Sequence, residues 1–213
     1  MDTKYSDLAI ILLGKILEKA GKQSLGELAD SWIFKSLNME DTMYNPDTLK
    51  NNIAPTEIDK RFRNRLIIGE VHDENAFLLG GVAPHAGIFS TASDIGKFFQ
   101  TLLNGGTWLG KRKFNRNQIN TFIDKQNLPL GSDRAIGFDT PSKNGKSSAG
   151  DLFSDRTFGH LGFTGTSVWA DMERNIIIIL LTNRVHPTRE KEGIYMVRRE
   201  FHTKVMEALL KAT

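Results

Sequence analysis

Three features that this sequence lacks exclude several kinds of site and partner. It contains no cysteine, which excludes disulfides, thiolate metal sites and cysteine nucleophiles. Its longest apolar run, residues 176–181, is far shorter than the roughly 20 residues of a membrane-spanning helix, so we expect no membrane span. Its 28 basic and 25 acidic side chains are scattered and form no basic stripe, so nucleic acid is not an expected partner.

The start of the chain, Met1-Asp2-Thr3-Lys4, has no apolar signal region. We therefore expect no export signal within this chain, and composition alone leaves the compartment open. With 213 residues, 39% of them hydrophobic, the chain can bury one sizeable core. This predicts one domain, or most of one.

Helical patterns dominate the first 40 residues. Apolar side chains recur at helical spacing over residues 8–20, and Gly21 is the expected stop. Ser24 and Glu27 have capping-box spacing and open a second amphipathic stretch, which Asn38 should end. Two helices are therefore predicted before residue 40.

Residues 41–75 have little periodicity and predict a long irregular excursion, and the glycine-rich residues 80–87 predict a tight connection with close backbone approach. A helix should follow, capped by Thr91 or Ser93 and ended by glycines at 105 and 106. Residues 141–155 read as a solvated loop.

The last third of the chain predicts a hairpin and a helix. Residues 166–170 form the first strand, 171–175 the turn, and 176–182 a central strand buried on both faces. A helix over residues 190–211 should pack on this sheet through an apolar stripe. The stripe consists of Ile194, Val197, Phe201, Val205 and Leu209.

Four polar side chains between these elements allow a metal-site interpretation. Imidazole and carboxylate groups suit zinc or iron, and the four are His72, Asp73, Glu74 and His85. Their spacing matches no helical zinc pattern. An ordered loop explains the same residues, so we expect no metal.

Four segments, in this order, resemble the elements of one enzyme family. Tyr5-Ser6-Asp7-Leu8 is similar to its Tyr-x-Asn element, and Leu37-Asn38-Met39-Glu40-Asp41-Thr42 to its Leu-Gly-Met turn, which a threonine follows. Gly87-Ile88-Phe89-Ser90-Thr91-Ala92-Ser93-Asp94-Ile95 is similar to its glycine and Ser-Thr-Ala-x-Asp helix start, and Gly159-His160-Leu161-Gly162-Phe163-Thr164-Gly165-Thr166 to its Lys-Thr-Gly strand in the histidine variant. Together they resemble the β-lactamase-like serine hydrolases, which include class C β-lactamases, D-alanyl-D-alanine carboxypeptidases and related esterases.

The resemblance implies an α/β (α+β) fold of the β-lactamase and DD-peptidase type, an antiparallel sheet flanked by helices, incomplete at the N-terminus. Residues 1–213 would form a single partial domain. Residues 1–130 would be mainly a helical lobe with loops, and residues 131–213 the sheet hairpin with the C-terminal helix. The family implies no cofactor and a periplasmic or extracytoplasmic location.

The resemblance also assigns roles to five residues. Tyr5 would relay a proton to the leaving group, and His160, where the family usually has lysine, would donate to substrate or leaving group. Asp7 replaces an asparagine and could hold the nucleophile's lysine. Gly162 leaves room for substrate, and the Phe163 N–H would be one of two oxyanion donors. The structural alternatives are a packing role for Tyr5, a helix N-cap for Asp7 and a hydrogen-bonded strand residue for His160.

The nucleophile itself is absent, because no serine of these 213 residues has a lysine three positions later. We expect the Ser-x-x-Lys segment to come from the same gene product or from a separate chain. Without it, the isolated chain should expose an apolar patch and self-associate.

Two hypotheses about activity follow. Leu161 replaces the family's threonine, whose hydroxyl helps to hold a substrate carboxylate. This favours a peptidase or esterase, acting on a small molecule or a peptidoglycan-like peptide, over efficient β-lactam hydrolysis. The rival is a truncated or degenerate module of the same fold that binds such ligands without turnover.

Overall fold

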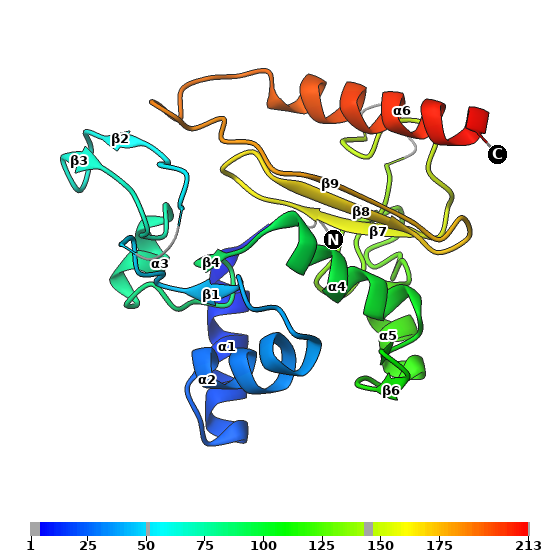
Figure 1. The fold of residues 1–213 in the computed structure, drawn as a ribbon, viewed down its shortest axis with the longest axis horizontal. Coiled ribbons are helices and arrows are strands. Elements are labelled where there is room, and N and C mark those ends of the chain that lie inside the picture. Colours follow the sequence, from blue (N-terminus) through cyan, green and yellow to red (C-terminus); the bar gives the residue numbers. More distant parts are fainter. Residues whose placement is uncertain (1–4, 50–51, 143–146, 213) are drawn as a thin grey trace. The chain divides into compact units, whose positions relative to one another are not determined.

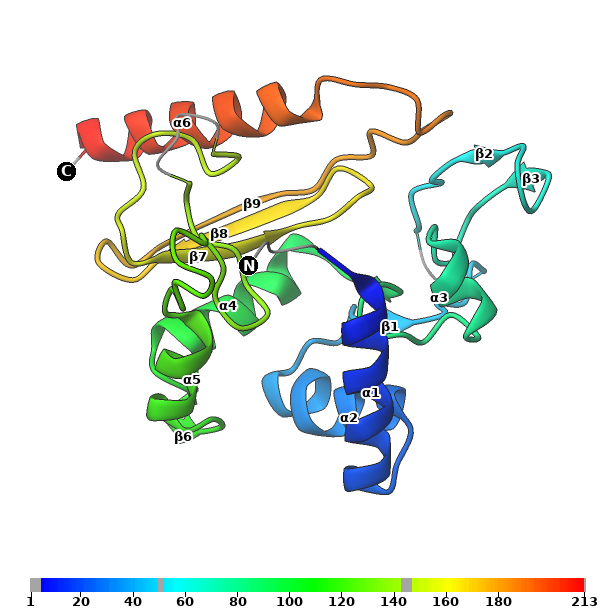
Figure 2. The same ribbon diagram turned by 180° about the vertical axis from the view of Figure 1, so that it is seen from behind.

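The computed structural model describes residues 5–49, 52–142 and 147–212 (Figures 1 and 2). The described chain falls into two compact units. The helical unit contains residues 5–98 and 183–190, and the sheet unit contains residues 99–182 and 191–212. The single partial domain spanning residues 1–213 stays a prediction.

The helical unit begins with α1 (Asp7–Gly21), close to the predicted residues 8–20. The chain leaves this helix at Lys22, whose φ of 53° is left-handed, one residue after the glycine expected to stop it. Gly14 is the buried residue of α1, and Pro84 packs closely on it, since a Cβ on Gly14 would lie 2.7 Å from Cγ of Pro84. The glycine-rich connection therefore packs against α1 at a position where no side chain fits.

The second helix starts as its sequence predicts. In α2 (Leu25–Ala29), Ser24 accepts a hydrogen bond from the Glu27 backbone and the Glu27 side chain accepts one from Ser24, which is a complete capping box. The helix continues through a π-helical turn and a 3₁₀ turn, η1 (Asp30–Phe34) and η2 (Lys35–Leu37). It ends at Asn38, with a left-handed φ of 57°.

The excursion after Asn38 contains only short elements. These are β1 (Met43–Tyr44), β2 (Ile58–Asp59), β3 (Arg65–Leu66), α3 (Glu74–Leu78) and β4 (Ile88–Phe89). β1 pairs with β4 and β2 pairs with β3, both antiparallel. Positive φ angles at Gly80, Gly81 and Gly87 allow the connection between α3 and β4 to turn tightly.

Two of the family-like segments meet at the start of α4 (Ala92–Leu103). The buried Asp94 carboxylate accepts hydrogen bonds from the Asp41 backbone at 2.8 Å and the Thr42 hydroxyl at 3.0 Å. The Thr42 hydroxyl also lies 2.7 Å from the Ser90 hydroxyl. The helix-start segment and the turn 37–42 thus form one hydrogen-bonded contact, and Thr91 acts as the predicted cap through its bond from the Asp94 N–H.

The sheet unit contains the second half of α4 and seven further elements. These are β5 (Thr107–Trp108), β6 (Lys111–Arg112), α5 (Arg116–Ile123), β7 (Thr157–Leu161), β8 (Ser167–Asp171), β9 (Ile176–Leu180) and α6 (Ile194–Ala212). The expected hairpin is β8 and β9. β7, β8 and β9 form an antiparallel sheet in that order.

The predicted central position of residues 176–182 is wrong within the described sheet. β8 lies in the middle, and β9 lies at one edge, with intermediate burial at four of its five positions. The uninterrupted apolar run suggested two covered faces, but it carries no information on which strand pairs on both sides. A short apolar strand at a sheet edge has the same sequence pattern.

The two faces of this sheet carry different contacts. On one face the Phe158 ring of β7 stacks on Phe99 of α4 at 5.7 Å and meets Phe138 edge-on at 5.1 Å. α6 runs along the other face (Figures 1 and 2), where Ser167 of β8 bonds to His202 of α6. Because side chains alternate along a strand, His160 shares the face of Phe158 and points away from α6.

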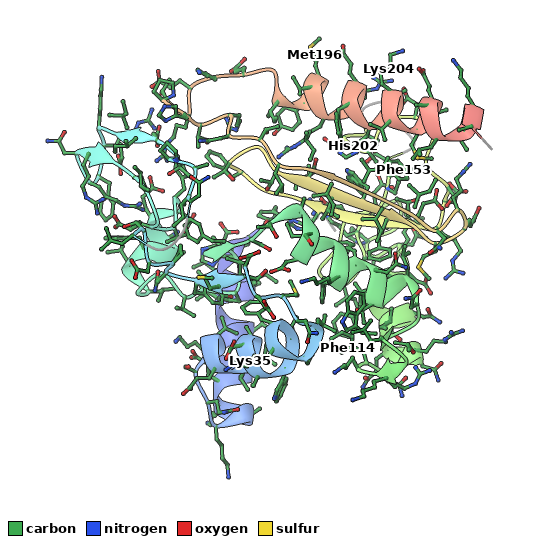
Figure 3. The ribbon with its side chains drawn as sticks, viewed as in Figure 1. Lys35, Phe114, Phe153, Met196, His202 and Lys204 are labelled. Atoms are coloured by element: carbon green, nitrogen blue, oxygen red, sulfur yellow. The ribbon has the colours of Figure 1, made fainter. Side chains whose placement is uncertain are left out.

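The predicted apolar stripe of α6 is wrong in part: Ile194, Phe201 and Val205 are half-buried, but none of the five predicted residues is fully buried. The buried residues of this helix are Arg198, His202 and Met206, whereas Val197 and Leu209 are exposed. Figure 3 shows His202 on the sheet side of α6 and Met196 and Lys204 on the opposite side. Two polar side chains occupy the inner face because the sheet offers them hydrogen-bond partners, which an apolar pattern does not reveal.

In the part of the chain that the structure describes, no helix is long and apolar enough to cross a membrane.

Candidate active site

The turn between β7 and β8, residues 162–166, is the most tightly bonded part of the candidate site. The Gly162 N–H donates to the Thr166 carbonyl at 2.8 Å, and the Gly165 N–H donates to the Gly162 carbonyl at 3.0 Å. The Thr182 hydroxyl donates to the Gly165 carbonyl at 2.6 Å from the end of β9. Gly165 has a φ of +117°, so only glycine suits this position.

Two glycines of this region are explained by their immediate neighbours. A Cβ on Gly162 would lie 2.2 Å from the Thr166 hydroxyl oxygen, so the turn itself demands a small residue there. A Cβ on Gly159 would lie 2.6 Å from the Trp169 ring on β8. The contact with Thr166 is thus sufficient to explain the glycine at position 162. That this glycine also leaves room for substrate stays a prediction.

His160 is held in one tautomer by the backbone. Its Nδ1 lies 2.9 Å from the Leu161 carbonyl, and a carbonyl only accepts, so Nδ1 carries the hydrogen. In the neutral ring, Nε2 is then a hydrogen-bond acceptor, and it donates only when the ring is protonated. This geometry suits a group that takes up a proton. The donor role expected from the sequence requires the imidazolium form.

Phe163 extends from the turn with a side chain that is 60% exposed. Its backbone N–H belongs to the same peptide unit as the Gly162 carbonyl. His160, Gly162 and Phe163 are therefore brought together at one end of β7, as the sequence predicts for three of the five site residues.

Tyr5 and Asp7 lie in the helical unit, at the start of α1. Tyr5 is 63% exposed and precedes the helix, so burial does not support the packing alternative. Asp7 is the first helical residue and Ser6 is the N-cap, so the N-cap alternative for Asp7 is wrong by one position. A carboxylate in the first turn is favoured by the helix dipole. The convergence of Tyr5 with His160 stays a prediction.

Two side chains of α6, one on the turn and one on the start of β8, were missed by the sequence analysis. Nη2 of the buried Arg198 donates to the carbonyls of Gly162 at 2.6 Å and Thr166 at 2.7 Å. One helical turn later, Nε2 of His202 lies 3.0 Å from the Ser167 hydroxyl. Burial, and then the positive charge of Arg198, lower the pKa of His202 to about 4. The sequence does contain a signal for these two residues, because a spacing of four places both polar side chains on the same side of the helix.

The residues of the alternative metal site are paired separately. His72 Nε2 lies 2.9 Å from the buried Glu57 carboxylate, and His85 Nε2 lies 3.0 Å from Asp73, which also caps α3. Among the described residues, no three such side chains are arranged to hold a metal ion. These two hydrogen bonds, together with the ion pair of Glu74 with Arg189 at 2.7 Å, provide a structural account of all four side chains.

Glu57 is the centre of an ionic network in the helical unit. Besides His72, it accepts hydrogen bonds from the Arg189 backbone at 2.8 Å and Arg189 Nε at 2.7 Å. Burial by itself would raise the pKa of Glu57, but the bonds from Arg189 and His72 outweigh it and hold the pKa at about 2. This network ties the excursion to residues 183–190, which follow the sheet.

Comparisons with known proteins identify the family of this chain. The family model described as Beta-lactamase matches residues 2–202. The chain belongs to the beta-lactamase family. Among the relatives, a protein of Escherichia coli (strain K12) named "Putative D-alanyl-D-alanine carboxypeptidase" is 34% identical over 203 residues, covering 85% of this chain and 45% of the relative. An N-acetylmuramyl-L-alanine amidase of Bacillus subtilis (strain 168) is 32% identical over 204 residues, covering 85% and 44%.

Solved structures give the same beta-lactamase fold. A beta-lactamase from Mycobacterium bovis superposes with a TM-score of 0.66 at 17% identity, over 98% of this chain and 63% of that protein. The expected α/β fold of the β-lactamase type is confirmed. The chain spans less than half the length of the two curated beta-lactamase family relatives named above.

Proposed function

We propose that this chain supplies the acid–base and oxyanion side of an acyl-serine hydrolase of the beta-lactamase family, which acts on amide or ester bonds of cell-wall peptides. The observation that carries this proposal is the β7–β8 turn. The turn follows directly after His160, whose tautomer is fixed. It also holds the peptide unit that contains the Phe163 N–H, because the carbonyl of that unit, on Gly162, accepts a hydrogen bond from the Gly165 N–H. Acyl transfer needs these two functions next to a nucleophile.

In the proposed reaction, the serine hydroxyl of a Ser-x-x-Lys segment attacks the substrate carbonyl. The Phe163 N–H would donate to the oxyanion, and Gly162 would let substrate lie along the strand. Tyr5 would pass the serine proton to the leaving group, with His160 receiving or returning a proton beside it. Asp7 would hold the ammonium of the segment's lysine.

The choice of cell-wall peptides rests on the relatives. A carboxypeptidase named for D-alanyl-D-alanine and an amidase named for N-acetylmuramyl-L-alanine both match most of this chain. Leu161 offers no hydroxyl to a substrate carboxylate, which favours such peptides or esters over β-lactams.

The surface of α1 supports an added segment. Large apolar side chains on this helix are exposed, and a solvated helix rarely presents so many. They are Leu8, Ile10, Leu12, Leu13, Ile16 and Leu17. We propose that the Ser-x-x-Lys segment, from the same gene product or from a separate chain, covers this surface.

Covalent labelling tests the proposal. The chain alone should not react with a fluorophosphonate probe. The chain produced together with a Ser-x-x-Lys segment from a relative should be labelled on that serine, and Ser→Ala in the segment should abolish the label. Tyr5→Phe should slow labelling about 100-fold, within the range of general acid–base effects. Labelling of the isolated chain would refute the need for a segment.

The rival function is ligand binding without turnover, which the missing Ser-x-x-Lys pattern favours. Titration of the purified chain with an acyl-D-alanyl-D-alanine peptide, followed by NMR, separates the two. Binding at the β7–β8 turn with no labelled product in any assembly would favour the rival.

A further inference from the structure

Arg198 fixes two carbonyls of the β7–β8 turn at once. The two hydrogens of its Nη2 point to Gly162 and Thr166, whose carbonyls already accept the N–H groups of Gly165 and Gly162. The guanidinium is buried, and charged donors make stronger hydrogen bonds than neutral ones. The turn is thus held from the α6 side by a single side chain.

This contact also determines the direction of the neighbouring N–H. The peptide bond between Gly162 and Phe163 is trans, so its carbonyl and its N–H point in opposite directions. With the Gly162 carbonyl directed at Arg198 on α6, the Phe163 N–H is directed away from α6. His160 points away from the same helix.

We propose that Arg198 is a positioning residue of the active site, which aims the Phe163 N–H at the face of the sheet that carries His160. This inference rests on the proposed function, in which that N–H binds the oxyanion. Arg198 touches no reacting atom and acts through the peptide unit of residues 162 and 163. The adjacent Ser167–His202 contact fixes the start of β8 on the same side.

The neighbouring Arg199 provides a matched control. It lies on the same helix, is 43% exposed, and bonds to Asp151 at 2.9 and 3.0 Å, away from the turn. Arg198→Met and Arg199→Met therefore remove the same groups from adjacent positions. Arg198→Lys keeps the charge on a shorter, non-planar head that is not expected to hold both carbonyls.

Amide hydrogen exchange of the 213-residue chain, measured by NMR, is the first test. The N–H groups of Gly162 and Gly165 should exchange at least tenfold faster in Arg198→Met, and by a smaller factor in Arg198→Lys. The β8 amides and the Arg199→Met control should stay as in the wild type. If Arg198→Met does not fold, Arg198→Lys decides. Unchanged turn exchange, or equal acceleration throughout β8, would overturn the proposal.

Kinetics of the assembly with the Ser-x-x-Lys segment is the second test. With p-nitrophenyl acetate, Arg198→Lys should lower kcat at least tenfold and leave KM within twofold, because the oxyanion bond forms in the transition state. A raised KM with unchanged kcat would contradict positioning. Failure of the wild-type assembly to turn over any ester would refute the proposed function, whereas unchanged exchange would refute the role of Arg198.

Discussion

The β7–β8 turn and α1 differ in how much of each region is bonded to or covered by the rest of this chain. The turn carbonyls are bonded by backbone amides, by Arg198 and by Thr182, all within the sheet unit. In α1, by contrast, Gly14 is the one buried residue of a fully described helix, and most large apolar side chains are exposed. Both regions carry family-like residues of the candidate site.

For the proposed function, the difference separates the part of the site that this chain holds by its own contacts from the part that we expect an added segment to cover. The β7–β8 turn, which carries the proposed oxyanion donor, is held by this chain, because charged and neutral donors bond to its carbonyls. The surface that bears Tyr5 has the apolar character of a buried interface. We infer that α1 gains its packing from the added segment, and that the β7–β8 turn does not depend on it.

The largest expected contrast is between a core ring and an exposed side chain. Phe158→Ala should lower the free energy of unfolding by roughly 4 kcal/mol, because Phe158 is 1% exposed and packs on Phe99 and Phe138. Ile16→Ala on α1 should change it by less than about 0.5 kcal/mol. Urea titration followed by circular dichroism measures both. A large loss in Ile16→Ala would mean that α1 is already covered in the isolated chain.

The Glu57 network should make the helical unit sensitive to acid. The folded-state pKa of Glu57, about 2, lies below its ordinary value of 4.5, so its stabilisation is complete above pH 4.5 and lost as pH falls toward 2. The full effect is about 3 kcal/mol. Glu57→Gln should remove this slope and, at pH 7, should destabilise by up to a similar amount, since Arg189 keeps only Glu74 of its two carboxylate partners. Acid unfolding curves with the wild-type slope in Glu57→Gln would contradict this.

His202 should give the sheet unit a slope in a different pH window. Its folded-state pKa of about 4 lies below 6.5, so the unfolded chain binds the extra proton between these values. The free energy of unfolding should therefore fall as pH drops from 6.5 to 4, by at most about 3 kcal/mol, and then level off. His202→Gln should lose this slope, while Glu57→Gln keeps it. Fluorescence of the buried Trp169 monitors unfolding of this unit.

Charged substitutions on the α1 surface should change stability little. Leu12→Glu combined with Ile16→Glu should alter the free energy of unfolding by less than about 1 kcal/mol, because both side chains are exposed. The same double variant should reduce self-association of the isolated chain in sedimentation velocity and prevent assembly with the Ser-x-x-Lys segment. A wild-type chain that sediments as a monomer at all concentrations would contradict the predicted self-association.

Local features of the fold were predictable because their causes are local. The capping box of Ser24 and Glu27, the left-handed stop at Asn38 and the Thr91 cap each depend on residues within one helical turn. The hairpin of β8 and β9 also follows from a short turn. The clustering of His160, Gly162 and Phe163 is predictable because they are neighbours along one strand and its turn.

The errors arose where partners are distant in sequence. An apolar run could not show that β9 is an edge strand of the described sheet, because strand order depends on where β7 pairs. The buried face of α6 was predicted from apolar spacing, yet Arg198 and His202 lie on it. Gly162 and Thr166 accept hydrogen bonds from Arg198 Nη2, and Ser167 bonds to His202 Nε2, which offsets part of the cost of burying these two side chains.

The sequence alone determined the family-like segments, the absence of a Ser-x-x-Lys nucleophile in this chain and the starts and stops of most helices, because residue type and short-range spacing decide these. Only the tertiary structure showed that Arg198 holds the turn from 36 residues away and that α1 leaves its apolar side chains exposed. Contacts of this kind depend on the path of the whole chain, which brings distant residues within bonding distance or leaves them apart.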